Sequence, residues 1–155
     1  MTTRLADARQ SDEIIFVASR LFGPLHLQRA DLIVMPQGML GFAGERRFVL
    51  LPATADRIFW LQSVDEGGLI FLLADPFLFF PEYEVDAPEI PEPAEGEEVV
   101  VLAIVTLPRG ESEACTVNLL APIVIRHPGR EARQVVLAGQ RYHTKHRIDL
   151  RSRLG

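Results

Sequence analysis

The chain has 155 residues, of which 48% are hydrophobic and 24% are charged, with 16 Lys and Arg against 21 Asp and Glu. This composition predicts one ordinary domain with its own core. With 11 Gly, 11 Pro, one cysteine and a formal net charge of −5, it excludes collagen-like and disulfide-scaffold classes and disfavours a direct nucleic-acid partner.

Residues 1–19 are interpreted as an N-terminal lead-in, and residues 1–17 fit either a short helix or an irregular chain. The apolar run from Ile14 to Ala18 is too short for the core of a signal peptide. The longest aliphatic run of the whole chain, Val99 to Val105, is far short of the roughly 20 residues of a membrane-spanning helix. We therefore expect a cytoplasmic protein without a membrane partner.

Pro and Gly leave room for long helices only at 1–22, 53–66 and 140–154, and such frequent breakers predict short strands joined by turns. Short turn signals such as Pro36-Gln37-Gly38 favour antiparallel neighbours. We expect an all-β, mostly antiparallel barrel or sandwich with short or few helices and without an internal domain boundary. The predicted strands are Leu21–Leu27, Leu32–Met35, Phe48–Leu51, Ile58–Gln62, Leu69–Ala74, Val99–Leu107, Thr116–Leu119, Ile123–Arg126 and Gln134–Leu137.

Charge is distributed unevenly along this domain. Eight acidic residues and no basic residue lie between positions 82 and 98, and the stretch 87–98 reads as an exposed, proline-rich acidic loop. Eight basic residues lie between position 126 and the end, against two acidic ones. The basic block fits a solvated tail, an intramolecular partner for the acidic block, or a module for single-stranded nucleic acid that uses Arg141, Lys145, Arg147, Arg151 and Arg153.

Cys115 is the first candidate for catalysis, because a lone cysteine can form a nucleophile pair with a histidine such as His127 or His26. It begins a strand-like run with no basic neighbour, which favours a structural thiol. Glu82 and Glu84 would share one face of a strand, as an acid and base pair can. Within a run of eight acids, we interpret them as a solvated ridge.

His143 and His146 are the candidates for a metal site, because a spacing of three can place two ligands on one helical face. The neighbouring Arg141, Lys145 and Arg147 would repel a dication. We therefore expect no metal, no cofactor and no catalytic residues, since no enzyme class has support from these residues. A hydrolase centred on Cys115 and His127 is the enzyme alternative.

The ordered apolar segments resemble the flagellar assembly factor FliW family over residues 20–148. The matching stretches are Ile33-Val34-Met35-Pro36-Gln37-Gly38-Met39-Leu40-Gly41-Phe42, Phe48-Val49-Leu50-Leu51-Pro52, Phe59-Trp60-Leu61-Gln62-Ser63, Leu69-Ile70-Phe71-Leu72-Leu73-Ala74-Asp75-Pro76-Phe77, Phe80-Pro81-Glu82-Tyr83-Glu84, Thr116-Val117-Asn118-Leu119-Leu120-Ala121-Pro122-Ile123-Val124-Ile125, Arg130 with Gln134-Val135-Val136-Leu137, and Tyr142. Each stretch alone is a weak signal, but the ordered set is specific.

The resemblance implies a compact, mostly antiparallel β-barrel-like single domain over residues 20–148, followed by a basic tail at 149–155. It also implies a non-enzymatic protein with two protein partners. Family members hold flagellin in the cytoplasm as chaperone-like partners, and they bind CsrA, an RNA-binding repressor of flagellin translation. The resemblance also implies that partner exchange is the mechanism: when flagellin is scarce, the protein is free to sequester CsrA and to relieve repression. The runner-up function is the nucleic-acid-binding module in the basic C-terminal segment.

The acidic segment is the expected binding site, because an RNA-binding partner presents a basic surface that these carboxylates attract. A monomer is the favoured state. Asn118 and Gln62 are polar residues within apolar runs, and each is either a satisfied core amide or a contact group. Gly38 and Gly41 are expected in turns. The predicted partner-binding residues are Glu82, Tyr83, Glu84, Asp86, Glu97, Glu98 and Asn118.

Overall fold

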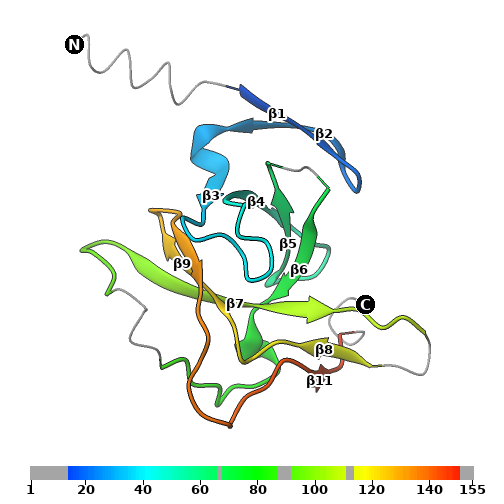
Figure 1. Cartoon of the computed structure of the whole chain (residues 1–155), viewed down its shortest axis with the longest axis vertical. Coiled ribbons are helices and arrows are strands. Elements are labelled where there is room, and N and C mark those ends of the chain that lie inside the picture. Colours follow the sequence, from blue (N-terminus) through cyan, green and yellow to red (C-terminus); the bar gives the residue numbers. More distant parts are fainter. Residues whose placement is uncertain (1–13, 66–67, 87–91, 111–113, 151–155) are drawn as a thin grey trace.

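The computed structural model describes residues 14–65, 68–86, 92–110 and 114–150, which form strands joined by turns and two one-turn 3-10 helices (Figure 1). The two helices are η1 (Arg29–Asp31) and η2 (Pro76–Leu78). The strands are β1 (Ile14–Ser19), β2 (Gly23–Gln28), β3 (Leu32–Val34), β4 (Arg47–Pro52), β5 (Ile58–Ser63), β6 (Ile70–Ala74), β7 (Glu98–Thr106), β8 (Cys115–Val117), β9 (Ile123–His127), β10 (Ala132–Gln134) and β11 (His146–Ile148).

All pairings between these strands are antiparallel, which confirms the predicted fold class. The main sheet has the order β10-β9-β7-β6-β5-β4-β3, and β8 pairs with β7 and β11. Consecutive strands from β3 to β7 are neighbours in this order. The β4–β5 and β5–β6 connections are short, as expected for hairpins, whereas β6 and β7 are joined by residues 75–97, which include η2. The prediction of short or few helices is likewise confirmed for the described residues.

The longest strand, β7, organises the sheet because it pairs with three others. β9 pairs with its first half, from Glu98 to Leu102, while β6 and β8 pair with its second half. Between these two pairings, five residues of the β8–β9 connection (118–122) stand opposite only two of β7 (103–104). This insertion makes the β8–β9 connection bulge away from β7.

The sheet does not close into a ring, so the barrel-like part of the prediction is not confirmed. Its two edges, β3 and β10, are linked through an isolated bridge between Val34 and Glu131. Arg130 reinforces this link, since its side chain donates to the backbone carbonyls of Asp31 at 2.9 Å and Leu32 at 3.2 Å. The edges therefore approach each other without a continuous ladder of hydrogen bonds.

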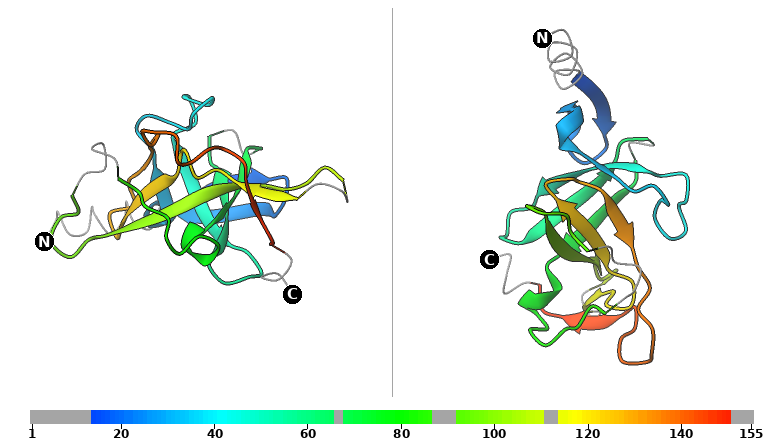
Figure 2. Two further views of the ribbon diagram at one scale, coloured as in Figure 1. Left: turned by 90° about the horizontal axis from the view of Figure 1, so that it is seen from below. Right: turned by 90° about the vertical axis from the view of Figure 1, so that its left-hand side faces the viewer.

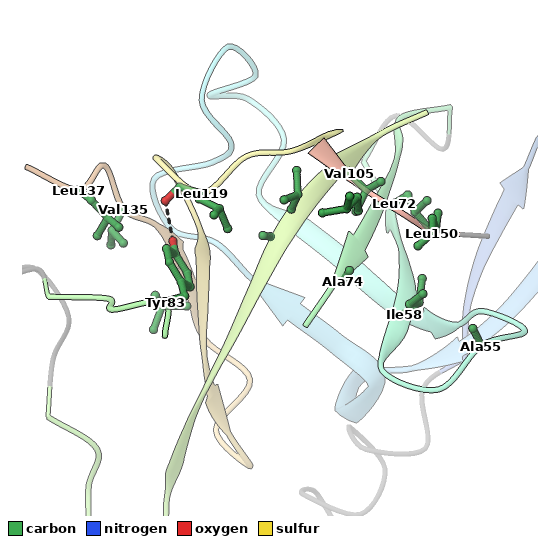
Figure 3. Packing of buried hydrophobic residues seen from close by; sticks show 14 residues of the cluster. Ala55, Ile58, Leu72, Ala74, Tyr83, Val105, Leu119, Val135, Leu137 and Leu150 are labelled. Carbon is green, nitrogen blue, oxygen red and sulfur yellow. Dashed lines mark hydrogen bonds between the residues drawn. The ribbon is translucent and has the colours of Figure 1, made fainter. Parts of the chain in front are cut away.

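Both faces of the main sheet are buried, which explains why its strands are continuously apolar rather than alternating. On β6, Leu73 belongs to one core cluster, whereas Leu72 and Ala74 belong to the cluster on the opposite face. Figure 3 shows this second cluster. The second cluster also contains Tyr83 and Leu119. The segments after η2 and after β10 cover this second face.

The lead-in contains a strand that the sequence prediction missed. β1 pairs along its length with β2, and this ribbon packs through Val17 and Leu27 on β3 and β4, at the end of the molecule opposite β8 and β11 (Figure 2). Ser19 on β1 also donates to Gln62 at 2.7 Å. Residues 1–13, and with them the rest of the lead-in, lie outside the described residues.

Gln62 is fully buried, and its carboxamide is hydrogen-bonded on both sides. It accepts from Ser19, and it donates to the backbone carbonyl of Ser63 at 3.0 Å. A buried amide with satisfied hydrogen bonds adds no penalty for its polarity. Of the two alternatives, the structure supports a core amide.

The connection between β3 and β4 requires a glycine at position 38. Gly38 has a φ of +71°, and a Cβ atom there would lie 2.5 Å from the carbonyl oxygen of Ala43, which confirms its place in a turn.

Asp65 accepts from the backbone amides of Arg46 and Arg47, each at 3.1 Å, and pairs with the Arg47 guanidinium at 2.8 Å. Partial burial raises the pKa of Asp65, but these hydrogen bonds outweigh burial and leave it lowered.

Candidate functional site

The short helix η2 precedes the first exposed acidic residues of the acidic segment, Glu82 and Glu84. Asp75 begins this helix, and its side chain accepts from the backbone amide of Phe77 at 2.9 Å. Pro76 stands at the first helical position, where its missing N–H costs nothing. The Phe80 amide then donates back to Pro76 at 2.9 Å and the Tyr83 amide donates to Phe80 at 3.0 Å. These hydrogen bonds turn the chain back across the second face of the sheet.

Tyr83 fastens this segment to the core. Its side chain is 5% exposed, and its hydroxyl donates to the backbone carbonyl of Leu119 at 2.6 Å (Figure 3). Burial, and secondarily the neighbouring Tyr142, raises the pKa of Tyr83 well above its usual range. Because Tyr83 is buried, Glu82 and Glu84 on either side of it are left exposed. The two carboxylates thus flank one anchored aromatic ring.

The segment after β10 runs beside Tyr83 and Glu84. Tyr142 meets the Tyr83 ring edge to face, with 4.8 Å between centroids, and its hydroxyl accepts from the Glu84 amide at 3.0 Å. Arg141 donates to the Glu84 carboxylate at 3.1 Å, and its guanidinium lies 5.3 Å from the Tyr142 ring centroid. Arg141, one of the five basic residues considered above for nucleic-acid binding, is therefore an intramolecular partner of the acidic block.

Two surface hollows adjoin each other at Arg141 and Tyr142. The larger, about 410 Å³, we call the aromatic hollow; it is lined by Phe79, Phe80, Pro81, Glu82, Tyr83, Arg141 and Tyr142. The smaller, about 250 Å³, we call the acidic hollow; it is lined by Glu84, Asp86, Leu137, Ala138, Arg141 and Tyr142. Four of the seven predicted partner-binding residues, Glu82, Tyr83, Glu84 and Asp86, therefore line one continuous stretch of surface.

The other three predicted site residues lie elsewhere. Glu97 closes a turn by accepting from the Ala94 amide at 3.1 Å, and Glu98 begins β7 opposite His127. In Asn118, the side-chain oxygen accepts from two backbone amides of the bulge, those of Leu120 at 3.1 Å and Ala121 at 3.0 Å. This turn accounts for a polar residue in an apolar run, and a contact role for Asn118 stays a prediction.

The two candidate metal ligands, His143 and His146, are stacked on each other outside any helix. Their ring centroids lie 3.7 Å apart, and the His143 amide donates to Nε2 of His146 at 3.0 Å. Burial, and secondarily His143, lowers the pKa of His146. Within the described ranges there is no group of three or more side chains that could hold a metal ion.

The candidate catalytic pair is not assembled. His127 stands opposite Glu98 at the start of β7, whereas Cys115 lies just beyond the residue opposite Thr106 at its end. At about 3.4 Å per residue, this separates the two side chains by roughly 30 Å. The other candidate partner, His26, lies on the β1–β2 ribbon opposite Phe16. Cys115 and His127 are therefore too far apart to exchange a proton.

Sequence reasoning left pairing of the acidic and basic blocks open as one alternative, and Arg141 with Glu84 realises it. It missed the contribution of Tyr142 to the acidic surface. Arg151 and Arg153 lie outside the described residues. Among the described residues, no helix is long and apolar enough to cross a membrane.

Comparison with known proteins gives one consistent family. The sequence profile described as FliW protein matches residues 16–148. The relative named flagellar assembly factor FliW in Moorella thermoacetica is 37% identical over 140 residues, covering 85% of this chain and 87% of its own. The relatives of that name in Treponema denticola and Bacillus pumilus are 35% and 33% identical, covering 85% and 89% of this chain and 92% and 99% of theirs.

A solved structure agrees with these sequences. The chain described as the crystal structure of the flagellar assembly factor FliW superposes with a TM-score of 0.75 at 34% sequence identity. The superposition covers 85% of this chain and 95% of the other. Sequence and fold therefore point to the same family over nearly the same residues.

Proposed function

The chain belongs to the FliW family, and from this premise we propose that it is a flagellar assembly factor that acts in the cytoplasm by binding CsrA and flagellin. The match over residues 16–148 carries the proposal, because it includes the elements that build the site. The proposed role is non-enzymatic: a chaperone-like partner of flagellin and an antagonist of translational repression by CsrA.

The acidic surface supports a basic partner of this kind. Glu82, Glu84 and Asp86 are exposed and lie within a short stretch of chain; among the residues that the structure describes, Arg141 is the one cation lining the hollows. An RNA-binding protein presents Lys and Arg to phosphates, so this surface attracts it over a Debye length of about 8–10 Å. The same negative field disfavours RNA phosphates near the bound complex. Inhibition of RNA binding then does not require the RNA site itself to be covered.

Partner exchange completes the proposal. Flagellin binding and CsrA binding are coupled, so that newly made flagellin occupies the protein and releases CsrA to repress further translation. When flagellin leaves for assembly, the protein is free to take up CsrA again. Such coupling requires only that binding of one partner lowers the affinity of the protein for the other partner.

The test of the electrostatic part is a triple variant, Glu82→Gln, Glu84→Gln and Asp86→Asn, titrated with purified CsrA at low and at physiological salt. Exposed charge pairs contribute about 0.2–1 kcal/mol each, so the triple variant loses about 1–2 kcal/mol, or roughly five- to thirtyfold in affinity at low salt. Its affinity also varies less with salt than that of the unmodified protein.

The matched control is Asp56→Asn, which removes an exposed carboxylate on the turn between β4 and β5, outside both hollows. This control binds CsrA like the unmodified protein. Equal affinity of the triple variant and the unmodified protein at low salt would refute the proposed role of the acidic surface.

A further inference from the structure

The aromatic hollow has a lining unlike the rest of the surface. Four aromatic residues and one proline line a space of about 410 Å³, together with Glu82 and Arg141. Phe79, Phe80 and Tyr142 are half-buried, so part of each ring remains open to solvent. A space of this size accommodates a long side chain rather than a folded element.

The polar groups of the two tyrosines are already used. Tyr83 donates its hydroxyl proton to Leu119, and the Tyr142 hydroxyl accepts from the Glu84 amide. The hollow therefore offers an incoming group mainly ring faces and the carboxylate of Glu82. That carboxylate makes no ion pair with any residue that the structure describes. Aromatic faces beside an unpaired carboxylate are the chemistry that receives a cation.

Arg141 shows that this wall accepts a guanidinium. Its guanidinium lies over the Tyr142 ring and binds Glu84 on the side of the acidic hollow. Glu84 therefore neutralises Arg141, while Glu82, on the other side of Tyr83, remains available. Arg141 therefore already makes, within the protein, the kind of contact with an aromatic ring and a carboxylate that an external cation would make.

We propose that the aromatic hollow binds one arginine side chain of a protein partner. The alkyl stem lies on Phe79, Phe80 and Pro81, and the planar guanidinium lies against the rings beside Glu82. Arginine fits better than lysine because its delocalised cation stacks on aromatic rings and pairs with a carboxylate at the same time. The identity of the partner as CsrA rests on the proposed function, but the chemistry of the hollow does not.

The direct test uses a minimal probe, the capped tripeptide glycine-arginine-glycine amide, titrated into the full chain while the backbone amide resonances are followed by NMR. The expected result is saturable binding in the millimolar range, with shifts concentrated at residues 79, 80, 82, 83, 141 and 142, since Pro81 has no amide proton. The same peptide with citrulline, which keeps the shape but lacks the charge, binds at least about tenfold more weakly. Equal binding of the citrulline peptide, shifts centred elsewhere, or no saturable binding would overturn the proposal.

Variants separate the ring faces from the carboxylate. Glu82→Gln weakens the arginine probe roughly two- to fivefold. Glu95→Gln, which removes an exposed carboxylate from the same acidic segment but outside both hollows, leaves the binding unchanged. Tyr142→Phe keeps the ring and the probe affinity, whereas Tyr142→Leu loses most of the binding. A loss of affinity in Glu95→Gln as large as in Glu82→Gln would contradict a specific pocket.

A parallel titration with CsrA distinguishes this proposal from the proposed function. If the arginine probe binds as described but CsrA does not bind, the hollow is confirmed and the partner is wrong. If CsrA binds the unmodified protein and Glu82→Gln equally and the probe does not bind, the proposed function stands and the arginine site is refuted.

Discussion

The hydroxyl of Tyr83 provides the sharpest test of how the site is fixed to the core. Tyr83→Phe removes one oxygen atom and creates no large cavity, but it leaves the buried carbonyl of Leu119 without the 2.6 Å hydrogen bond. An unsatisfied buried acceptor costs about 1–3 kcal/mol. For a chain of this length, that cost lowers the melting temperature by about 4–8 °C if it is near 2 kcal/mol.

Tyr142→Phe is the matched control, because it also removes one hydroxyl from the same pair of rings. The hydrogen bond that Tyr142→Phe loses, from the exposed Glu84 amide, is replaced by one to water, so we expect the free energy of unfolding to change by no more than about 0.5 kcal/mol. Urea unfolding measures the free energy of unfolding of both variants, and the comparison holds if their m-values are unchanged. If Tyr83→Phe is as stable as the unmodified protein, or if Tyr142→Phe loses more, then the assigned anchor is wrong.

Alkaline pH provides a second readout of the same residue. Because burial raises the pKa of Tyr83 above its unfolded value near 10, its contribution to stability is present below about pH 10 and is lost as the pH rises further. The difference in stability between the unmodified protein and Tyr83→Phe therefore narrows above pH 10. Since the chain has two tyrosines, Tyr142→Phe leaves Tyr83 alone for titration by ultraviolet absorbance.

Three further predictions concern the scaffold. Gly38→Ala is destabilised by more than about 2 kcal/mol in urea unfolding, whereas Gly41→Ala, with positive φ but open space, loses about 1 kcal/mol; equal losses would contradict the clash with Ala43. Because the pKa of Asp65 is lowered, Asp65→Asn is less stable than the unmodified protein above about pH 4, and the gap closes as the pH falls toward 2. Asn118→Ala loses about 1–2 kcal/mol in urea unfolding; full stability would refute its role in the bulge.

The central strands could be predicted from the sequence because local signals and burial agree there. β4, β5, β6, β7 and β9 are apolar runs between Pro and Gly turns, and each matches its prediction to within one residue at either end. The errors lie where a segment is a strand because of its partner strand rather than because of its own sequence pattern. β1 begins in a stretch read as helix or irregular chain, and it is a strand because β2 pairs with it. β11 lies in a polar stretch and exists because β8 offers an edge.

The site could be predicted only in part, because some of its residues meet only in the folded chain. The charge block located Glu82, Glu84 and Asp86, since consecutive acids cannot be buried together without partners. The aromatic hollow depends on Tyr142, which is 59 positions from Tyr83 in the sequence and meets it only after the sheet has folded. Composition alone contains no information on that contact. Pairing of the acidic and basic blocks was among the alternatives, and Arg141 with Glu84 realises it.

The most direct test of the proposed function is a competition measurement with purified components. Labelled CsrA is first bound to the protein, and flagellin is then added while the fraction of bound CsrA is followed. The account predicts that flagellin releases CsrA in a concentration-dependent manner, and that CsrA added to the flagellin complex has the reciprocal effect. Unchanged CsrA binding at saturating flagellin, with both partners shown to bind separately, would contradict partner exchange.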